Sequence, residues 1–181
     1  MKLLHPYLPG SRESEQRETL AFLEQLKDNT NYTIEHIKTI DELDYETAIK
    51  YHWNQGEPFI ILEQDNVPTL EILDSIRNCS EPICAANYIL NMKDRKNVVS
   101  QYMSNRIITA GNATLIKAIK YVTNEEYADL YGFGLVKITP FGRYPFMPSN
   151  WRDMDSRLSI YTSKYGYKAH IHGTIKHNHA K

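Results

Sequence analysis

The nine residues PFIILEQDN, 58–66, indicate how this chain folds. Four consecutive apolar residues in the middle of this stretch, 59–62, are bounded by a proline on one side and by turn-forming residues on the other. Such a run is typical of a central strand that is covered on both faces, as in a parallel α/β sheet. Side chains alternate along a strand, so we expect Glu63 and Asp65 to point to one side and Gln64 to the other.

The two acids come where the predicted strand ends. Ligands of open α/β sheets collect outside the carboxyl ends of the strands. Glu63 and Asp65 are therefore either a metal site or a pair of solvated residues at the end of a strand. This stretch alone leaves both interpretations open.

The first half of the chain alternates between strand and helix patterns. Strands are expected at 2–6, 32–38 and 81–90 in addition to 59–62, and helices at about 12–27, 39–53 and 69–77. Thr39 and Glu42 are expected to form a capping box at the start of the second helix. This alternation predicts an α/β fold: one Rossmann-like domain, 1–181, with a mostly parallel mixed sheet flanked by helices.

The second half is less regular in pattern. Asn112 is expected to cap a helix over 113–122, and Asn124 a short helix through residue 130. A strand opened by two glycines is expected at 132–141. A helix should follow, capped by residue 149 or 150 and ended by Gly166.

Composition limits the classes of function. The 181 residues are 41% hydrophobic and 24% charged, which is typical of a globular protein. A net charge of −1 disfavours nucleic acid as the main partner. No apolar stretch approaches the roughly 20 residues of a transmembrane segment, and the first residues do not resemble a signal peptide, so we expect a cytoplasmic protein. Cys79 and Cys84 have no second cysteine pair for a zinc ribbon, and we interpret them as two thiols.

The last residues contain four of the seven histidines. They form two H-x-H pairs, His170/His172 and His177/His179. In an extended segment each pair projects to one face, and this spacing suits metal ligation. A polar, frayed terminus is the alternative, and we favour ligation by at least one of the four.

In a predicted helix that starts near Trp151, two aspartates lie on opposite sides. At about 100° per residue, Asp155 lies beside Trp151 and Leu158 on the apolar side, whereas Asp153 lies on the solvent side. An acid on the inner side of the first turn favours a functional role for Asp155. Asp153 is interpreted as structural.

Nucleotide-binding signatures based on glycine are absent. The chain has no Walker loop, and the single Gly132-Phe133-Gly134 is not a dinucleotide fingerprint. These glycines are expected to pack or to shape a pocket. The charge of a bound nucleoside diphosphate would then have to be offset by a divalent ion.

In their order along the chain, three motifs resemble those of small GT-A-type glycosyltransferases, including compact ones of archaeal viruses. Glu63-Gln64-Asp65 stands where that family has its acidic D-x-D or E-x-D motif. WRDMD, 151–155, is similar to a helix-starting W-x-x-x-D segment, and AHIHGTIKHNH, 169–179, to a histidine-rich ending. The resemblance implies a nucleotide-sugar-binding half, 1–92, and an acceptor-side half with a metal-binding tail, 98–181.

The resemblance also implies roles for individual residues. The cation would be Mn²⁺ or Mg²⁺, with ligands drawn from Asp65, Glu63, His172 and His170. The nucleotide-diphosphate sugar donor would contact Pro6, Tyr7, Glu63 and Gln64, with Tyr7 stacking on the base. Asp155 would be the catalytic base toward a saccharide, lipid or protein acceptor.

Two other functions remain as alternatives. A sugar-phosphate nucleotidyltransferase would share the sheet and the metal, but the loop after the first strand lacks the Pro-Lys that this class uses. A non-enzymatic, histidine-rich metal-binding protein would bind metal through the tail alone. In that case Asp65 would have no role.

Overall fold

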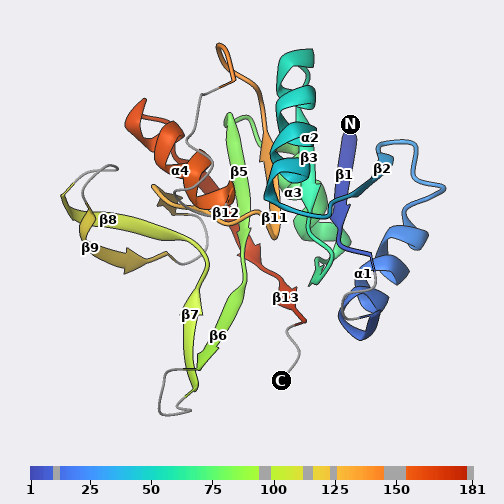
Figure 1. Ribbon diagram of the computed structural model, residues 1–181, viewed down its shortest axis with the longest axis horizontal. Coiled ribbons are helices and arrows are strands. Elements are labelled where there is room, and N and C mark those ends of the chain that lie inside the picture. The colour runs from blue at the N-terminus through green and yellow to red at the C-terminus, as the bar shows by residue number, and fades with distance from the viewer. Residues whose placement is uncertain (10–12, 94–98, 112–115, 123–125, 145–153, 179–181) are drawn as a thin grey trace.

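The computed structural model describes residues 1–9, 13–93, 99–111, 116–122, 126–144 and 154–178. They form an α/β fold built around a seven-stranded sheet (Figure 1). The helices are α1 (Glu13–Gln25), α2 (Glu42–Gln55), α3 (Leu70–Asn78) and α4 (Met154–Lys164). The strands of the large sheet, in spatial order, are β10 (Tyr127–Ala128), β12 (Ala169–Thr174), β5 (Ile83–Asn87), β11 (Leu135–Ile138), β3 (Phe59–Leu62), β1 (Lys2–Tyr7) and β2 (Thr33–Lys38).

Three two-stranded ribbons accompany this sheet. They pair β4 (Asn66–Val67) with β13 (Lys176–His177), β6 (Ile89–Lys93) with β7 (Val99–Met103), and β8 (Arg106–Gly111) with β9 (Ile116–Tyr121). The β6–β7 and β8–β9 hairpins extend away from the large sheet in Figure 1. The β4–β13 ribbon instead joins the C-terminal part of the chain to the segment that follows β3.

The α/β fold predicted from the alternating elements is confirmed. β1 pairs in parallel with both β2 and β3, as expected for consecutive strand–helix–strand units. The sheet as a whole is mixed, because β11 runs antiparallel to both of its neighbours, β3 and β5. A strand from the second half of the sequence therefore lies between two strands from the first half.

Helices cover the two faces of the large sheet in pairs. On one face, α2 and α4 pack through Ile49, Trp53, Met154 and Leu158. On the other face, α1 and α3 pack through residues that include Leu23 and Leu73. This arrangement explains the uninterrupted apolar run of β3, whose four side chains are each at most 1% exposed.

Two predicted helices in the second half are wrong. Residues 116–121 form strand β9, and 127–128 form β10. β9 pairs antiparallel with β8, and most of its residues are exposed. Local sequence did not reveal this pairing, because contacts with another strand can override intrinsic helix propensity. The proposed caps Asn112 and Asn124 lie outside the described residues.

The predicted capping box of α2 is also wrong. Asp41 is the N-cap, and its Oδ1 accepts hydrogen bonds from the N–H groups of Leu43 and Asp44, both at 2.9 Å. Thr39 instead donates from its Oγ1 to the carbonyl oxygen of Tyr7, at 3.1 Å. This bond joins the residue after β2 to the end of β1, where the predicted site residues Pro6 and Tyr7 lie.

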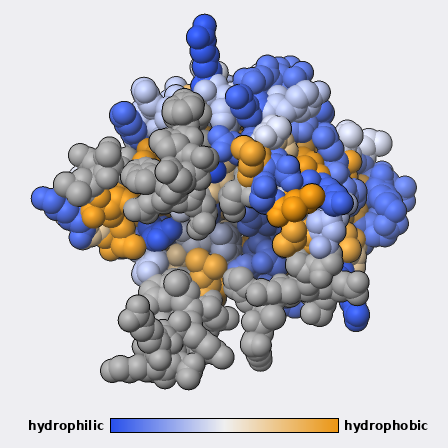
Figure 2. Space-filling model, in the orientation of Figure 1, coloured by the Kyte–Doolittle hydropathy of each residue, from blue (hydrophilic) through white to orange (hydrophobic). Residues whose placement is uncertain are grey.

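The surface mixes apolar and polar side chains. Figure 2 shows apolar side chains in several separate groups on this face, one of them over the β8–β9 hairpin. Within the described part of the chain, none of the helices combines the length and the hydrophobicity needed to cross a membrane.

Candidate functional site

A cavity of about 250 Å³ lies at the carboxyl ends of β1 and β3. Its lining consists of Pro6, Tyr7, Leu8, Thr39, Tyr45, Glu63, Gln64 and Asp65. Parallel strands end at the same edge of a sheet, which brings residues separated by almost 60 positions in the sequence together. All four residues predicted to contact a nucleotide, Pro6, Tyr7, Glu63 and Gln64, line this one cavity.

Gln64 connects the two loops that form the cavity. Its Oε1 accepts hydrogen bonds from the Leu8 backbone N–H at 2.7 Å and from Gln16 Nε2 at 2.9 Å. Gln16 Nε2 also donates to the Leu8 carbonyl oxygen, at 3.2 Å. Through these contacts, Gln64 shapes the cavity wall.

Glu63 is held by a tyrosine from α2. The Tyr45 hydroxyl donates a hydrogen bond to Glu63 Oε1 at 3.0 Å. Burial, followed by the charge of Glu63, raises the pKa of Tyr45 well above its usual value, so the hydroxyl remains a donor at neutral pH. The sequence offered no signal for Tyr45 beyond its place in an amphipathic helix.

Asp65 meets a histidine of the C-terminal segment. His177 Nε2 lies 3.2 Å from Asp65 Oδ2, and the other ring nitrogen, Nδ1, lies 3.2 Å from the carbonyl oxygen of Ile89. A backbone carbonyl at Nδ1 fixes a proton there and directs Nε2 toward the carboxylate, as in many metal-ligating histidines. The pairing of β13 with β4 places His177 opposite Asn66, next to Asp65 in the sequence.

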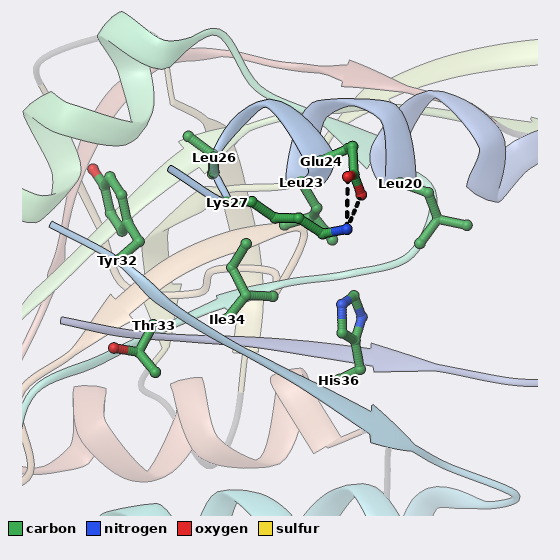
Figure 3. Close-up of a pocket in the computed structure, with 9 residues that line it drawn as sticks. All are labelled: Leu20, Leu23, Glu24, Leu26, Lys27, Tyr32, Thr33, Ile34 and His36. Carbon is green, nitrogen blue, oxygen red and sulfur yellow. Dashed lines mark hydrogen bonds and ion pairs between the residues drawn. The ribbon is translucent and has the colours of Figure 1, made fainter. Parts of the chain in front are cut away.

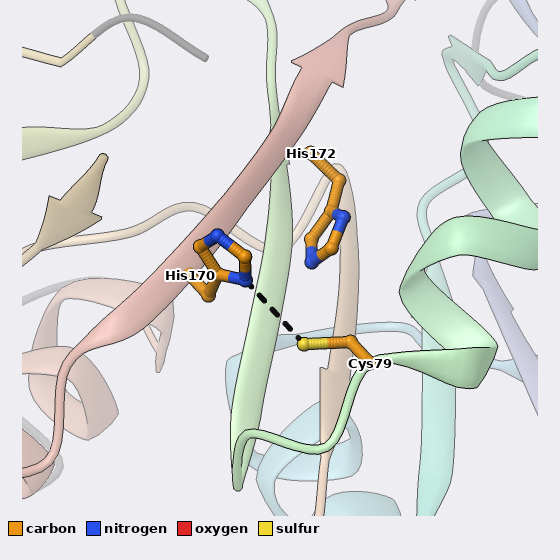
Figure 4. A group of neighbouring side chains, drawn as sticks. All are labelled: Cys79, His170 and His172. Atoms are coloured by element: carbon orange, nitrogen blue, oxygen red, sulfur yellow. Dashed lines mark hydrogen bonds between the residues drawn. The ribbon is translucent and has the colours of Figure 1, made fainter. Parts of the chain in front are cut away.

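The structure does not bring His170 and His172 to Asp65. Both lie on β12, which is separated from β3 by β5 and β11 in the sheet. Three steps between neighbouring strands correspond to roughly 14 Å. Among the described residues, the group whose ligand atoms all lie within 4.8 Å of one another is Cys79, His170 and His172 (Figure 4). The partner of Asp65 is instead His177, a member of the second histidine pair. His179, the other member, lies outside the described residues.

Cys79 and Cys84 form a disulfide. This differs from the two thiols expected from the sequence. Cys79 directly follows α3, and Cys84 lies at the start of β5, so the turn between them brings the two sulfur atoms together. A spacing of five residues does not reveal such a turn in the sequence.

The three predicted acids converge on Tyr88. Its hydroxyl is buried, and burial together with the charges of Glu63, Asp155 and Asp65 raises its pKa well above the usual value. Its ring also packs against that of His177, with centroids 4.9 Å apart. Since electrostatic effects of this kind fall with distance, the charges of Glu63, Asp65 and Asp155 all act near the Tyr88 hydroxyl.

The first turn of α4 explains the position of Asp155. Met154 and Leu158 are at most 1% exposed and pack in the core, while Asp155 between them is half-buried. The charge of Asp155 also raises the pKa values of Tyr45 and Tyr131. Asp155 is thus partly buried, and its role as a catalytic base stays a prediction. Trp151 and Asp153 lie outside the described residues.

The two glycines before β11 make room for Tyr88. A Cβ atom on Gly134 would lie 2.6 Å from the Tyr88 ring and 2.8 Å from Asn66 Oδ1. A Cβ on Gly132 would overlap the Tyr88 hydroxyl. Of the two roles expected for Gly132-Phe133-Gly134, the structure therefore assigns packing around Tyr88 to the glycines.

A larger hollow of about 690 Å³ lies between α1 and β2 (Figure 3). It is lined mainly by aliphatic side chains of α1 and by residues of β2, and its charged residues, Glu24 and Lys27, pair with each other. None of the acids or histidines at the end of β3 lines it. We therefore place the candidate site at the end of β3.

The comparisons with known proteins add no assignment. No family model matches the sequence, and no curated protein matches it either. The geometry of the described residues is therefore the basis of the functional proposal.

Proposed function

We propose that this protein is a metal-dependent glycosyltransferase, which moves a sugar from a nucleotide-diphosphate donor to a saccharide, lipid or protein acceptor. The observation that carries this proposal is the end of β3. Glu63 and Asp65 border the cavity formed with Pro6 and Tyr7, and His177 closes on Asp65 at 3.2 Å.

The chemistry of the side chains fits a divalent cation. Two carboxylates and an imidazole provide oxygen and nitrogen ligands that suit Mn²⁺ and, with more water, Mg²⁺. Asp65, Glu63 and His177 are the residues that would hold the ion, and because their ligand atoms do not all lie within 4.8 Å of one another, the side chains would have to move closer together on binding. When bound, the cation would stabilise negative charge on the leaving diphosphate by several kcal/mol.

Other side chains would position the two substrates. Tyr7 is available to stack on the nucleoside base at the cavity wall, and Tyr45 holds Glu63 in place through its hydroxyl. Asp155, whose charge also acts on the Tyr88 hydroxyl, would accept the proton of the acceptor hydroxyl as it attacks the anomeric carbon. Such transfer needs a carboxylate oxygen within about 2.6–3.2 Å of that hydroxyl.

A thermal-shift panel of nucleoside diphosphates, with and without Mn²⁺, tests this proposal. Ligand binding stabilises the native state by about 2.7 kcal/mol at a hundredfold excess over Kd. We expect stabilisation by at least one nucleotide only in the presence of Mn²⁺, and its loss in Asp65→Asn, together with loss of nucleotide-sugar turnover. Unchanged turnover of Asp65→Asn, or of the wild type in EDTA, would contradict the proposal.

A further inference from the structure

A second group of metal-ligating side chains lies on the face of the sheet that α1 and α3 cover. Cys79 Sγ lies 3.6 Å from His170 Nδ1, and the His170 and His172 rings have centroids 4.4 Å apart. Figure 4 shows both rings directed from β12 toward Cys79. The disulfide adds Cys84, so two sulfur and two imidazole groups gather within one small volume.

Sheet geometry places these four residues together. β12 pairs in parallel with β5, and His170 lies opposite Cys84 in that register. Ala169 and Ile171 point into the core beneath α2 and α4, so alternation directs His170 and His172 to the other face, where Cys84 also lies. The Cα atoms of Cys79 and Cys84 are 6.7 Å apart, which is close enough for both sulfurs to reach one ion.

A buried lysine, Lys137, holds the backbone of Cys79 in place. Lys137 of β11 donates from its ammonium group to the carbonyl oxygen of Cys79, at the end of α3. Lys137 is the neighbour of Cys84 in the pairing of β11 with β5. The backbone that carries Cys79 is thus held to the sheet by a contact that does not depend on the disulfide.

We propose that in the reduced protein Cys79, Cys84, His170 and His172 form a zinc site, distinct from the site at the end of β3. Two thiolates and two imidazoles are a common tetrahedral ligand set for structural Zn²⁺. Thiolate ligands select zinc over Mn²⁺ and Mg²⁺, which prefer oxygen. The cytoplasm that the sequence led us to expect keeps such cysteines reduced.

Conversion of the disulfide to the zinc site requires a reductant. A dithiol reductant supplies two electrons and two protons, the bond between the two sulfurs breaks, and the reductant becomes a disulfide. Zn²⁺ then replaces the two thiol protons, which pass to solvent. In the reverse direction, the disulfide of the oxidised reductant would accept two electrons from the two thiolates and two protons from solvent, the bond between Cys79 and Cys84 would form again, and the ion would be released.

Cobalt titration of the full chain tests the proposal. The protein is reduced with a water-soluble phosphine, which becomes the phosphine oxide and contributes no thiol ligand. We expect Co²⁺ to produce thiolate-to-cobalt charge-transfer bands and the intense visible bands of tetrahedral cobalt, and Zn²⁺ to abolish both. The disulfide form should produce no charge-transfer band. If the reduced wild type gives no such bands, the proposal is wrong.

Variants assign the ligands and separate the two sites. Cys79→Ser should lose charge-transfer intensity, and His172→Ala should weaken cobalt binding. His36→Ala, which removes an exposed histidine of β2, should match the wild type, as should Asp65→Asn. Equal loss in His36→Ala and His172→Ala would contradict the assignment.

A measurement on the wild type does not depend on whether the variants fold. Zinc should protect both cysteines of the reduced protein from alkylation by iodoacetamide, since bound thiolates are poor targets. Alkylation at the same rate with and without zinc would overturn the proposal.

Discussion

Several negative charges act on the side chain of Tyr88. Glu63, Asp155 and Asp65 all act on its hydroxyl, and His177 packs against its ring. A phenol whose pKa is raised in this way stays protonated and can donate a hydrogen bond. At the scale of single residues, the cavity wall therefore combines two acids, Glu63 and Asp65, with Tyr45, whose neutral hydroxyl donates to Glu63.

Asp155→Asn tests the role of the base. If Asp155 accepts the proton of the acceptor, its amide replacement should lower the transfer rate by about 10²–10⁴-fold, since an amide cannot take up that proton. Affinity for the Mn²⁺–nucleotide complex, measured by calorimetry, should remain close to that of the wild type.

The control for this variant is Asp28→Asn, in an exposed turn after α1. It should leave both rate and affinity unchanged. Asp155→Asn with wild-type turnover, or with lost nucleotide binding, would remove the assignment of Asp155 as base. Asp153, which was predicted from the sequence to lie on the solvent side without a functional role, lies outside the described residues and is not used as the control.

His177 and His172 should differ in their effect on the nucleotide site. His177→Ala should weaken Mn²⁺-dependent nucleotide binding by about 10–100-fold, the range seen for residues around a metal. His172→Ala should leave it near wild type, because β5 and β11 lie between β12 and β3. Titration of Mn²⁺ at fixed nucleotide measures both, and equal losses would contradict the placement of the two histidine pairs.

The position of a side chain could be predicted where it follows directly from its element. Glu63 and Asp65 come where an apolar strand ends and line the cavity there, and Asp155 is half-buried at the start of its helix. Tyr45 and Tyr88 gave no comparable signal, and the H-x-H pattern that includes His177 did not show that His177 meets Asp65. Their positions depend on how α2, β5 and β13 meet the end of β3, which no local pattern encodes.

At the scale of elements, the accuracy of prediction follows the source of each element's stability. β3 and α3 have apolar patterns that match their own periods, and both were predicted nearly to their ends. β9 is largely exposed and is held by its partner β8, so its composition allowed a helix. Its pairing is a tertiary property, and the helix prediction at that position was wrong for this reason.

Gly134, the residue before β11, packs closely against the Tyr88 ring. Gly134→Ala would place a methyl group 2.6 Å from the Tyr88 ring, and this overpacking should lower the free energy of unfolding by about 1–3 kcal/mol. Urea denaturation measures this change.

A double-mutant cycle with Tyr88→Ala separates this clash from other effects. In the Tyr88→Ala background, the part of the cost of Gly134→Ala that comes from the ring should disappear, whereas the close contact with Asn66 Oδ1 remains. An unchanged cost in that background would show that the ring is not the cause.

At the scale of the whole molecule, the predicted α/β class was within reach of the sequence, but the order of the strands was not. β11 lies between β3 and β5, so the halves 1–92 and 98–181 contribute to one sheet. The alternation of elements predicts parallel neighbours within the first half and carries no information about a strand inserted from the second. The antiparallel centre of the sheet could therefore not be predicted.

Buried His5 makes the stability of the fold depend on pH. Burial lowers its pKa from 6.5 to about 4, despite a hydrogen bond to the Leu62 carbonyl oxygen and with a further lowering by His36. The unfolded chain therefore binds a proton between pH 6.5 and 4 that the folded chain does not. The contribution of neutral His5 is complete above pH 6.5 and is lost as the pH falls toward 4.

His5→Asn isolates this effect, because asparagine keeps an N–H donor near the Leu62 carbonyl but does not titrate. Between pH 7 and pH 5 the wild type should lose about 2 kcal/mol more unfolding free energy than the variant. Urea denaturation at the two pH values gives the difference. Identical losses in the two proteins would mean that His5 is not protonated preferentially in the unfolded state.

A single short piece of chain connects the two sites. β12 carries His170 and His172, Gly173 follows with φ at +71°, and β13 then carries His177 to Asp65. Binding at two sites on one molecule obeys reciprocity: the factor by which zinc changes nucleotide affinity equals the factor by which nucleotide changes zinc affinity. A factor of one would mean that the two sites bind their ligands independently despite the short connection through Gly173. Any other value would mean that the redox state of Cys79 and Cys84 regulates nucleotide binding.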